Sequence, residues 1–323
     1  MHLMRLILFL TAVLGLAVPA LAQTQWPTRS LAMLTPFLPG PGPDLYLRPL
    51  MAKVGEQIGQ IIVNDVRVGG GGALVLAQAA RAAPDGHTLV VVTNSNLIQR
   101  HLRPENTHDA VDFAHVSRLS LAPALLVISA GSPLQRLDDL VATAKASPGK
   151  LNYGSGGNGT PSHLQGATLQ ALTGIDSVHV PFKNAGDVIP SLIRGDLHFA
   201  FQVMSFGSPF VRSGKLRLLA TTGATRARQF PDAPTLYELI KNELAIQENW
   251  LGVAFPAKTP AAIVKRFHAE ILKALTDPAV QKGMETSGTN VSPSESPEEY
   301  TAYVRRESDK WRDIVKLSGV KVE

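Results

Sequence analysis

The 323-residue sequence predicts an α/β fold whose sheets are mainly parallel. Short aliphatic and β-branched runs alternate with helical patterns along the chain, which is typical of parallel strands joined by crossover helices. Hydrophobic residues make up 45% of the chain and charged residues 18%, so a real core can form and general disorder is excluded. The length predicts about two domains.

The first 22 residues have the layout of a secretory signal peptide. Arg5 charges a short leading region, residues 6–18 form an apolar run, and Ala20 and Ala22 provide the small-residue spacing that signal peptidase cleaves. The alternative is a buried or membrane-anchoring helix, but the run is shorter than the roughly 20 residues that span a bilayer. We therefore expect cleavage after Ala22 and export of the mature chain.

The rest of the composition excludes several classes of protein. The chain has no cysteine, so it cannot use a disulfide framework, a thiolate metal site, a cysteine nucleophile or a lipidated N-terminal cysteine. A net charge of +5 is too weak and dispersed to indicate a polyanion partner, and aromatics at 6% are too few for a surface that stacks on bases. We expect no nucleic-acid partner.

Strands and helices alternate through the first part of the mature chain. Residues 29–37 form the first expected strand, and Asp44 can cap a helix that runs to about Ile58. A turn of four glycines, Gly69–Gly72, precedes an alanine-rich helical stretch that ends near Arg81. Further strands are expected at 60–64 and over the apolar run 88–93.

The second part continues the alternation and ends in helices. We expect strands at 124–129, 150–153, 197–202, 216–221 and 250–255, and helices at 137–146 and 161–172. Thr259 is the expected N-cap of a helix that starts at Pro260 and runs to about Leu275. A capping box at 296–299 opens the last helix. Its apolar stripe predicts core packing and comprises Tyr300, Val304, Trp311, Ile314 and Val315.

Two glycine-rich loops, 36–44 and 154–163, each join a strand to a helix. Such loops lie at the carboxyl ends of strands, where open α/β sheets bind ligands. A helix start offers unpaired N–H groups and about half a positive charge, and glycines let a ligand approach the backbone. Ser155, Asn158 and Thr160 add side-chain donors, and Thr160 can cap the helix with Pro161 at its first position. Either loop alone is an ordinary turn, but the pair predicts an anion site in a shared cleft.

The same residues give no support for catalysis. Neither loop carries the Gly-Lys-Ser/Thr of a phosphate-binding loop, and Tyr153 occupies the place of the first glycine of a hydrolase elbow around Ser155. The histidines lack H-x-H and H-x-x-x-H spacing, so we expect no metal site and no cofactor. His163, at the third position of the expected helix, could bind the ligand or brace the loop.

In their order and spacing these loops resemble the substrate-binding proteins of tripartite tricarboxylate transporters, the Bug family, over essentially the whole mature chain. The matching positions are Pro36-Phe37, Gly40, Asp44, Gly69, Gly71-Gly72, residues 83–88, 112–113, 144–145 and 148–153, Ser155, residues 157–160, 163–164, 179–183, 231–232 and 234–235, Glu238, Trp250 and residues 259–260. Each match alone is weak, and the set is specific.

The resemblance implies a two-lobed periplasmic binding protein (type II-like), each lobe a mainly parallel sheet flanked by helices. It implies a receptor that holds a small carboxylate between its lobes and hands it to membrane transporter subunits, with no catalysis. We expect a monomer with the signal peptide at 1–22, one lobe at 23–122 and 251–323, and the other at 123–250. The implied ligand-binding residues are Phe37, Leu38, Gly40, Gly42, Asp44, Asn94, Ser95, Ser155, Asn158, Gly159, Thr160, His163, Lys183 and Gln202.

Several residues depart from the family pattern. Pro41 and Pro43 replace a glycine and a Thr or Ser, so two backbone donors are missing and the first loop should be stiffer. Pro49 should delay or kink the following helix. Gln202 stands where many relatives carry an aspartate that suits an ammonium group, so we expect a ligand without a positive amine. Asn94 and Ser95 either line the cleft or form a polar turn.

Two other functions stay open at this point. The liganded protein could dock onto the ectodomain of a membrane sensor kinase instead of a carrier. It could also be a secreted serine hydrolase that uses Ser155 and His163, although no local base supports this.

Overall fold

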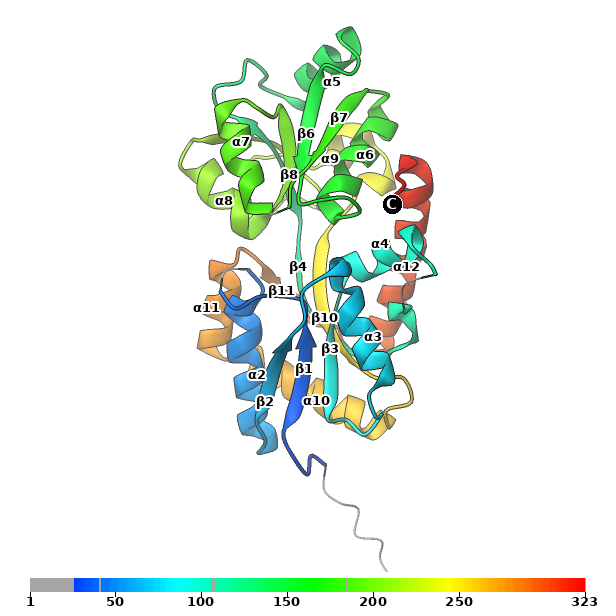
Figure 1. The fold of residues 1–323 in the computed structure, drawn as a ribbon. Coiled ribbons are helices and arrows are strands. Elements are labelled where there is room, and N and C mark those ends of the chain that lie inside the picture. Colours follow the sequence, from blue (N-terminus) through cyan, green and yellow to red (C-terminus); the bar gives the residue numbers. More distant parts are fainter. Residues whose placement is uncertain (1–25, 41, 106–107, 184, 323) are drawn as a thin grey trace, which may run out of the picture.

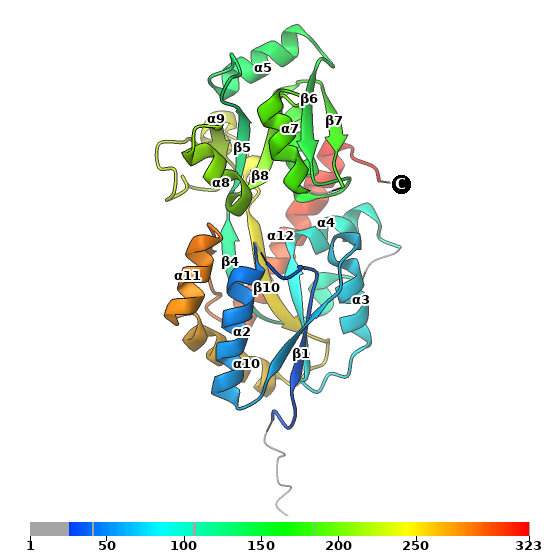
Figure 2. The same cartoon turned by 60° about the vertical axis from the view of Figure 1, so that its left-hand side comes forward.

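The computed structural model of the chain describes residues 26–40, 42–105, 108–183 and 185–322. Figures 1 and 2 show two lobes, one above the other, each built on a sheet with helices on both faces. The predicted signal peptide with its cleavage site after Ala22, and also Pro41, lie outside the described residues. In the part of the chain that is described, no helix is both long and apolar enough to cross a membrane.

The first lobe contains a six-stranded sheet in the order β11-β4-β10-β3-β1-β2. Its strands are β1 (Leu31–Thr35), β2 (Ile62–Val66), β3 (Thr88–Thr93), β4 (Ala114–Ala122), β10 (Asn249–Phe255) and β11 (Asn290–Val291). Its helices are α2 (Asp44–Ile58), α3 (Ala73–Arg81), α4 (Asn94–Leu102), α10 (Ala261–Ala274), α11 (Pro278–Thr286) and α12 (Pro297–Ser318), with short 3-10 turns η1 (Gly70–Gly72) and η2 (Ala110–Asp112).

The second lobe contains a five-stranded sheet in the order β7-β6-β8-β5-β9. Its strands are β5 (Ala124–Ser129), β6 (Leu151–Ser155), β7 (Ser177–Pro181), β8 (Phe199–Val203) and β9 (Leu216–Thr221). Its helices are α5 (Leu137–Ala146), α6 (Pro161–Thr173), α7 (Val188–Arg194), α8 (Met204–Arg212) and α9 (Leu236–Ile240), with 3-10 turns η3 (Ala185–Asp187) and η4 (Glu243–Ala245).

The predicted α/β fold of two lobes, each a sheet flanked by helices, is confirmed. Both sheets are mixed where mainly parallel ones were expected, because antiparallel pairs join the parallel pairs of β1 with β2 and β3 and of β6 with β7 and β8. In the first sheet β10 runs antiparallel to both β3 and β4, and in the second β5 runs antiparallel to both β8 and β9. The physical reason is how the chain passes between lobes. It enters each lobe where the parallel strands end, so the entering strand must run against them. The lobe boundaries at 122–123 and 250–251 stay a proposal.

Most of the predicted helices and strands are present in the structure. Two elements of the first lobe, helix α4 and strand β4, were not predicted. The observed bounds of β3, β5, α5 and β9 equal the predicted ones, and α2 ends at the predicted Ile58. Asp44 was expected to cap α2 but is its first residue, and Pro43 takes the N-cap position. Asn94 and Ser95, for which cleft lining and a polar turn were the two expectations, form the start of helix α4.

Ser296 is confirmed as the N-cap of the last helix, because its side chain accepts from the Glu299 N–H. The return bond of a full capping box, from the Ser296 N–H to the Glu299 side chain, is not among the bonds of the described residues. Thr259 is not an N-cap, because α10 begins one residue later than expected and Pro260 takes that position.

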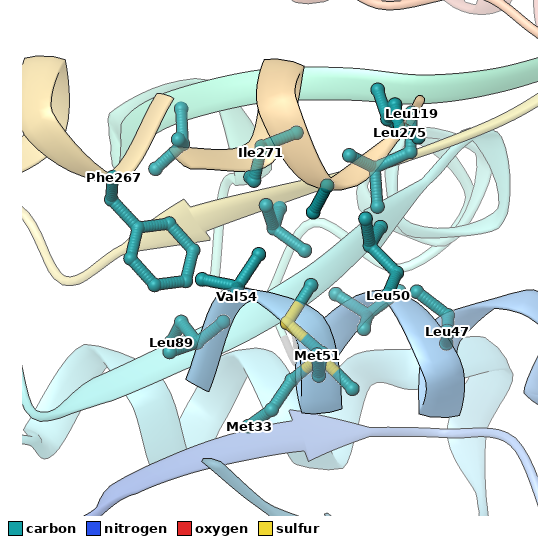
Figure 3. Packing of buried hydrophobic residues seen from close by; sticks show 14 of the residues in the cluster. Met33, Leu47, Leu50, Met51, Val54, Leu89, Leu119, Phe267, Ile271 and Leu275 are labelled. Atoms are coloured by element: carbon teal, nitrogen blue, oxygen red, sulfur yellow. The ribbon is translucent and has the colours of Figure 1, made fainter. Parts of the chain in front are cut away.

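Apolar side chains cover both faces of the first sheet. On one face α2 and α10 pack over Met33, Leu89 and Leu119 (Figure 3). On the other face the predicted stripe of α12 is buried, with Tyr300, Val304, Trp311 and Ile314 in the core and Val315 partly buried. Leu164 of α6, from the second lobe, belongs to this second cluster and is fully buried. The lobes therefore share apolar packing along α12.

Helix α2, which follows the first glycine-rich loop, is continuous despite Pro49. Neither a late start nor a break at Pro49 is observed, since the helix begins at Asp44 and ends at Ile58. Pro49 has no N–H to offer the Leu45 carbonyl one turn earlier. Helix α11 passes close to α2 at the Leu45 carbonyl. A Cβ added at Gly283 of α11 would lie 2.2 Å from the Leu45 oxygen. A glycine is therefore required where α11 crosses α2.

We predict that Gly283→Ala destabilises the fold by about 2–4 kcal/mol, because the added methyl must push α11 away from α2. Denaturant unfolding of the two proteins measures this difference. Gly131→Ala is the matched control, since its Cβ would meet only the Ser129 Oγ, at 3.9 Å. Equal stability of the two variants would contradict the proposed close approach.

Candidate functional site

Sheet topology brings the predicted site residues to two facing edges. The first loop follows β1, and Asn94 follows β3, which is the neighbour of β1. In the second lobe, the second loop follows β6, Lys183 follows β7, and Gln202 lies near the end of β8. These three strands are adjacent. Only Pro123 separates the end of β4 from the start of β5, so the carboxyl ends of the two sheets are turned toward each other.

The second loop leaves the start of helix α6 without a side-chain cap. Thr160 occupies the N-cap position and Pro161 the first helical position, as expected, but the Thr160 hydroxyl donates to the Gly157 carbonyl at 2.7 Å. Among the described residues, the N–H groups of Ser162 and His163 have no acceptor. The helix therefore presents unpaired donors and the positive end of its dipole.

Three glycine N–H groups of this loop are bonded inside the loop. Gly156 donates to the Ser162 Oγ at 3.3 Å, Gly157 to the Ser155 Oγ at 3.1 Å, and Gly159 to the His163 Nδ1 at 3.1 Å. The glycines thus shape the loop, and their N–H groups are not donors for a ligand. The Asn158 side chain is exposed and has no hydrogen bond to any described residue.

A stack of aromatic rings packs against the second glycine-rich loop. His163 lies parallel to His179 with ring centroids 3.7 Å apart, and Tyr153 packs on His179 at 5.0 Å and on Phe199 at 5.4 Å. The Ser155 Oγ is 2.6 Å from the His179 Nε2. The structure therefore pairs Ser155 with His179 and not with His163, and His163 braces the loop through Gly159.

Burial sets the charge of this stack. It lowers the pKa of His163 to about 4, and burial together with the neighbouring His163 lowers the pKa of His179 to about 4. Near neutral pH both rings are uncharged, and the His163 Nδ1 is the unprotonated nitrogen because it accepts from the Gly159 N–H. Protonation of this nitrogen would turn an acceptor into a donor that faces another donor.

The first loop is tied to the start of α2. The Gly40 N–H donates to the Asp44 carboxylate at 3.0 Å, and Arg48 pairs with the same carboxylate at 2.9 Å. Asp44 therefore braces its own loop. Phe37 is half-buried against the core, Gly42 is buried, and Leu38 is 64% exposed. The loop offers an apolar side chain, and Pro43 brings no N–H to the helix start.

The remaining predicted residues differ in how free their polar groups are. The Asn94 amide is buried and lies 3.5 Å from the Glu248 carbonyl and 3.4 Å from the Asn249 side chain, so it ties α4 to the returning chain. Gln202 is 5% exposed, yet its amide bonds to no described residue. Ser95 is half-exposed and Lys183 is exposed, and within the described ranges neither side chain has a polar partner.

Sequence reasoning missed Gln99, whose side-chain amide donates to the Gly159 carbonyl at 3.0 Å across the two lobes. No signal in the sequence indicated it, because the helix that carries Gln99 was itself not predicted. It also missed His179 and Ser162 as loop supports. The parallel register of β6 and β7, which pairs Tyr153 with His179, would have placed His179 beside the loop.

Within the described ranges, no three His, Asp or Glu side chains are grouped as metal ligands. A cavity of about 520 Å³ lies elsewhere in the second lobe, between the start of α5, β9 and residues 229–234. None of the predicted site residues lines it.

Comparisons with known proteins show what the chain is similar to in sequence and fold. The model of the tripartite tricarboxylate transporter family receptor matches residues 47–320. BugT of Bordetella pertussis is 29% identical over 315 residues, which cover 97% of this chain and 96% of that protein. An R. palustris protein solved with adipate has a TM-score of 0.79 at 26% identity, covering 92% of this chain and 99% of its own. MatC from Rhodopseudomonas palustris, with bound malate, has a TM-score of 0.77 at 27% identity, covering 90% and 100%.

The lowered histidine pKa values predict loss of stability in acid. Between pH 6.5 and about 4 the unfolded chain binds a proton at His163 that the folded chain does not, so stability falls as pH falls. Each such histidine contributes a slope of up to about 1.4 kcal/mol per pH unit. Denaturant unfolding between pH 7 and 4 should therefore give a shallower slope for His163→Asn than for the wild type.

The control for this measurement is His108→Asn, because His108 is exposed and is solvated in both states. Its slope should equal that of the wild type. The same slope in His163→Asn would show that the ring is protonated in the folded protein and does not brace the loop as a neutral acceptor.

Proposed function

The chain belongs to the TctC family of tripartite tricarboxylate transporter receptors, and on this premise we propose that it captures a small carboxylate between its lobes. It then delivers the ligand to the membrane subunits of such a transporter. The family consists of periplasmic solute-binding proteins, so the signal peptide with cleavage after Ala22 is part of the same proposal. The protein acts as a binding protein without a catalytic step.

The uncapped start of α6 is the observation that supports this proposal most directly. The free N–H groups of Ser162 and His163 lie at the positive end of the helix, and the Asn158 amide is exposed beside them. Because Thr160 points back at Gly157, no protein side chain competes with a ligand for these donors. A carboxylate can accept from them in charge-assisted bonds of about 1.5–3 kcal/mol each.

The other predicted site residues suit a ligand with an apolar chain and no ammonium group. Leu38 exposes a large apolar side chain on the first loop, and Gln202 contributes a neutral amide. Pro43 removes a backbone donor from the first loop. The adipate and malate bound by two similar proteins are both dicarboxylates without an amine. We therefore propose a mono- or dicarboxylate whose hydrocarbon part lies against the first loop.

The hydrolase alternative loses its geometric basis. Ser155 is fully buried, and its hydroxyl is shared between His179 and the Gly157 backbone, so it cannot reach a bound ester. Near the described Ser155 and His179 side chains, no carboxylate orients the imidazole. Docking onto a sensor kinase uses the same ligand site and differs only in the partner, which these residues do not specify.

We predict that a dicarboxylate such as adipate or malate raises the unfolding temperature of the purified protein, while the corresponding diamide does not. A ligand present at 100 times its Kd adds about 2.7 kcal/mol to the stability of the folded state. A thermal-shift series over acids of different chain length measures this. If no acid gives a shift above that of its amide, the carboxylate proposal fails.

A second prediction concerns Asn158. Asn158→Asp puts a negative charge beside the free helix N–H groups, so it should weaken carboxylate binding at least about tenfold. The unfolding temperature should change little because the side chain is exposed and has no partner among the described residues. Calorimetric titration gives the affinity. Gln135→Glu adds the same charge on an exposed residue before α5 and should leave the affinity unchanged.

A further inference from the structure

The turn of four glycines at Gly69–Gly72 has no part in the proposed ligand contacts, but it packs against helix α4. A Cβ at Gly71 would lie 2.8 Å from the Gln99 Cγ, and a Cβ at Gly72 would lie 2.6 Å from the Asn96 Nδ2. Both glycines also have positive φ, of 60° and 90°. The turn therefore leaves the space that the Gln99 side chain occupies.

From this space Gln99 reaches the second lobe. It is 5% exposed, and both ends of its amide are used. The Nε2 donates to the Gly159 carbonyl at 3.0 Å, and the Oε1 accepts from Arg103 at 3.2 Å. With both ends bonded, the amide has one orientation, and the donor faces the second loop.

The partner of Gln99 lies at the centre of the second loop. Gly159 has a φ of 72°, and a Cβ there would lie 2.9 Å from Leu102, 3.0 Å from the Gln99 Nε2 and 3.4 Å from Val322, all of the first lobe. The N–H of the same residue donates to His163. Gly159 is therefore held from both sides, by the first lobe through its carbonyl and by the ring stack through its N–H.

We propose that Gln99 is a positioning residue for ligand capture. By holding the Gly159 carbonyl it fixes the peptide plane between Gly159 and Thr160, while His163 holds the plane between Asn158 and Gly159 through the Gly159 N–H. Together they set the direction in which Asn158 and the start of α6 point. The glycine turn serves this function because only residues without a Cβ leave room for Gln99. Gln99 itself touches no ligand in this proposal.

The claim that Gln99 raises ligand affinity rests on the proposed carboxylate binding. The claim that Gln99 orders the second loop does not depend on it. Gln99→Met keeps the length and apolar packing of the side chain but cannot donate. We expect amide hydrogen exchange of the peptide 156–163 to become about three- to tenfold faster, the equivalent of one lost net hydrogen bond. Affinity for adipate or malate should fall by a similar factor through a faster dissociation rate.

Gln78→Met is the matched control, because Gln78 lies on the exposed face of α3 and reaches only Asp65, at 3.5 Å. It should change neither quantity. Unchanged exchange in Gln99→Met overturns the proposal, and so does faster exchange with unaltered affinity in a protein that binds acids. If the wild type binds no acid, the proposed function fails, and the exchange measurement alone decides the role of Gln99.

A double-mutant cycle tests the link to the glycine turn. Gly71→Ala should speed loop exchange strongly in the wild type but only weakly in the Gln99→Ala background, because the clashing side chain is then absent. Gly174→Ala, at a φ of 66° and with nothing within 4 Å of its Cβ, measures the backbone strain alone. Additive effects of Gly71→Ala and Gln99→Ala would overturn the link.

Discussion

The arrangement of the molecule depends on where the chain passes between its lobes. It leaves the first sheet at the end of β4, enters the second as β5, and returns as β10, each time at the ends of the parallel strands. Each entering strand is therefore reversed and lies in the interior of its sheet. Every loop at a carboxyl end then faces the other lobe, which is the condition for a ligand site made from both. The reversed strands that make the sheets mixed therefore also turn the loops of the proposed site toward the other lobe.

The second loop combines two requirements that oppose each other. Donors for an anion must be left unpaired, yet a loop with many free N–H groups would be poorly ordered. The structure assigns the two tasks to different groups. Ser155, Ser162 and His163 accept the N–H groups of three glycines and order the loop, while the first turn of α6 keeps its donors free. Neutral histidines suit the first task because an imidazole with a lowered pKa offers an acceptor nitrogen inside a buried stack.

Elements with strong local patterns could be predicted from the sequence, and those that depend on distant partners could not. The run at 88–93 has the bounds that its residues indicate, and the helix after the first loop ends at the predicted Ile58. Helix α4 begins with Asn94-Ser95-Asn96, which locally favours a turn. It is supported by distant and capping bonds, since the Asn94 amide donates to the Glu248 carbonyl, the Asn96 Oδ1 accepts from the Thr93 N–H, and the Gln99 amide donates to the Gly159 carbonyl. Strand β4 carries buried polar residues for the same reason, since Ser120 bonds to Tyr46 and His115 to the Ala110 carbonyl. The two loops were identifiable from glycine and helix-start patterns, but their internal bonding was not.

The two loops differ in chemistry, and this difference bears on how a ligand would be oriented. The second loop keeps free helix donors and a polar side chain, whereas the first has its one charged residue, Asp44, neutralised by Arg48 and an exposed Leu38 at its tip. An acid held by the second loop gains charge-assisted bonds there and apolar contact at the other end. Because the stronger, directional interactions belong to one lobe, the ligand would bind to that lobe first, and the first loop would then select by the length and polarity of the chain. In its proposed role, Gln99 adds to this asymmetry, because its hydrogen bond to the Gly159 carbonyl would order the loop of the second lobe before a ligand binds.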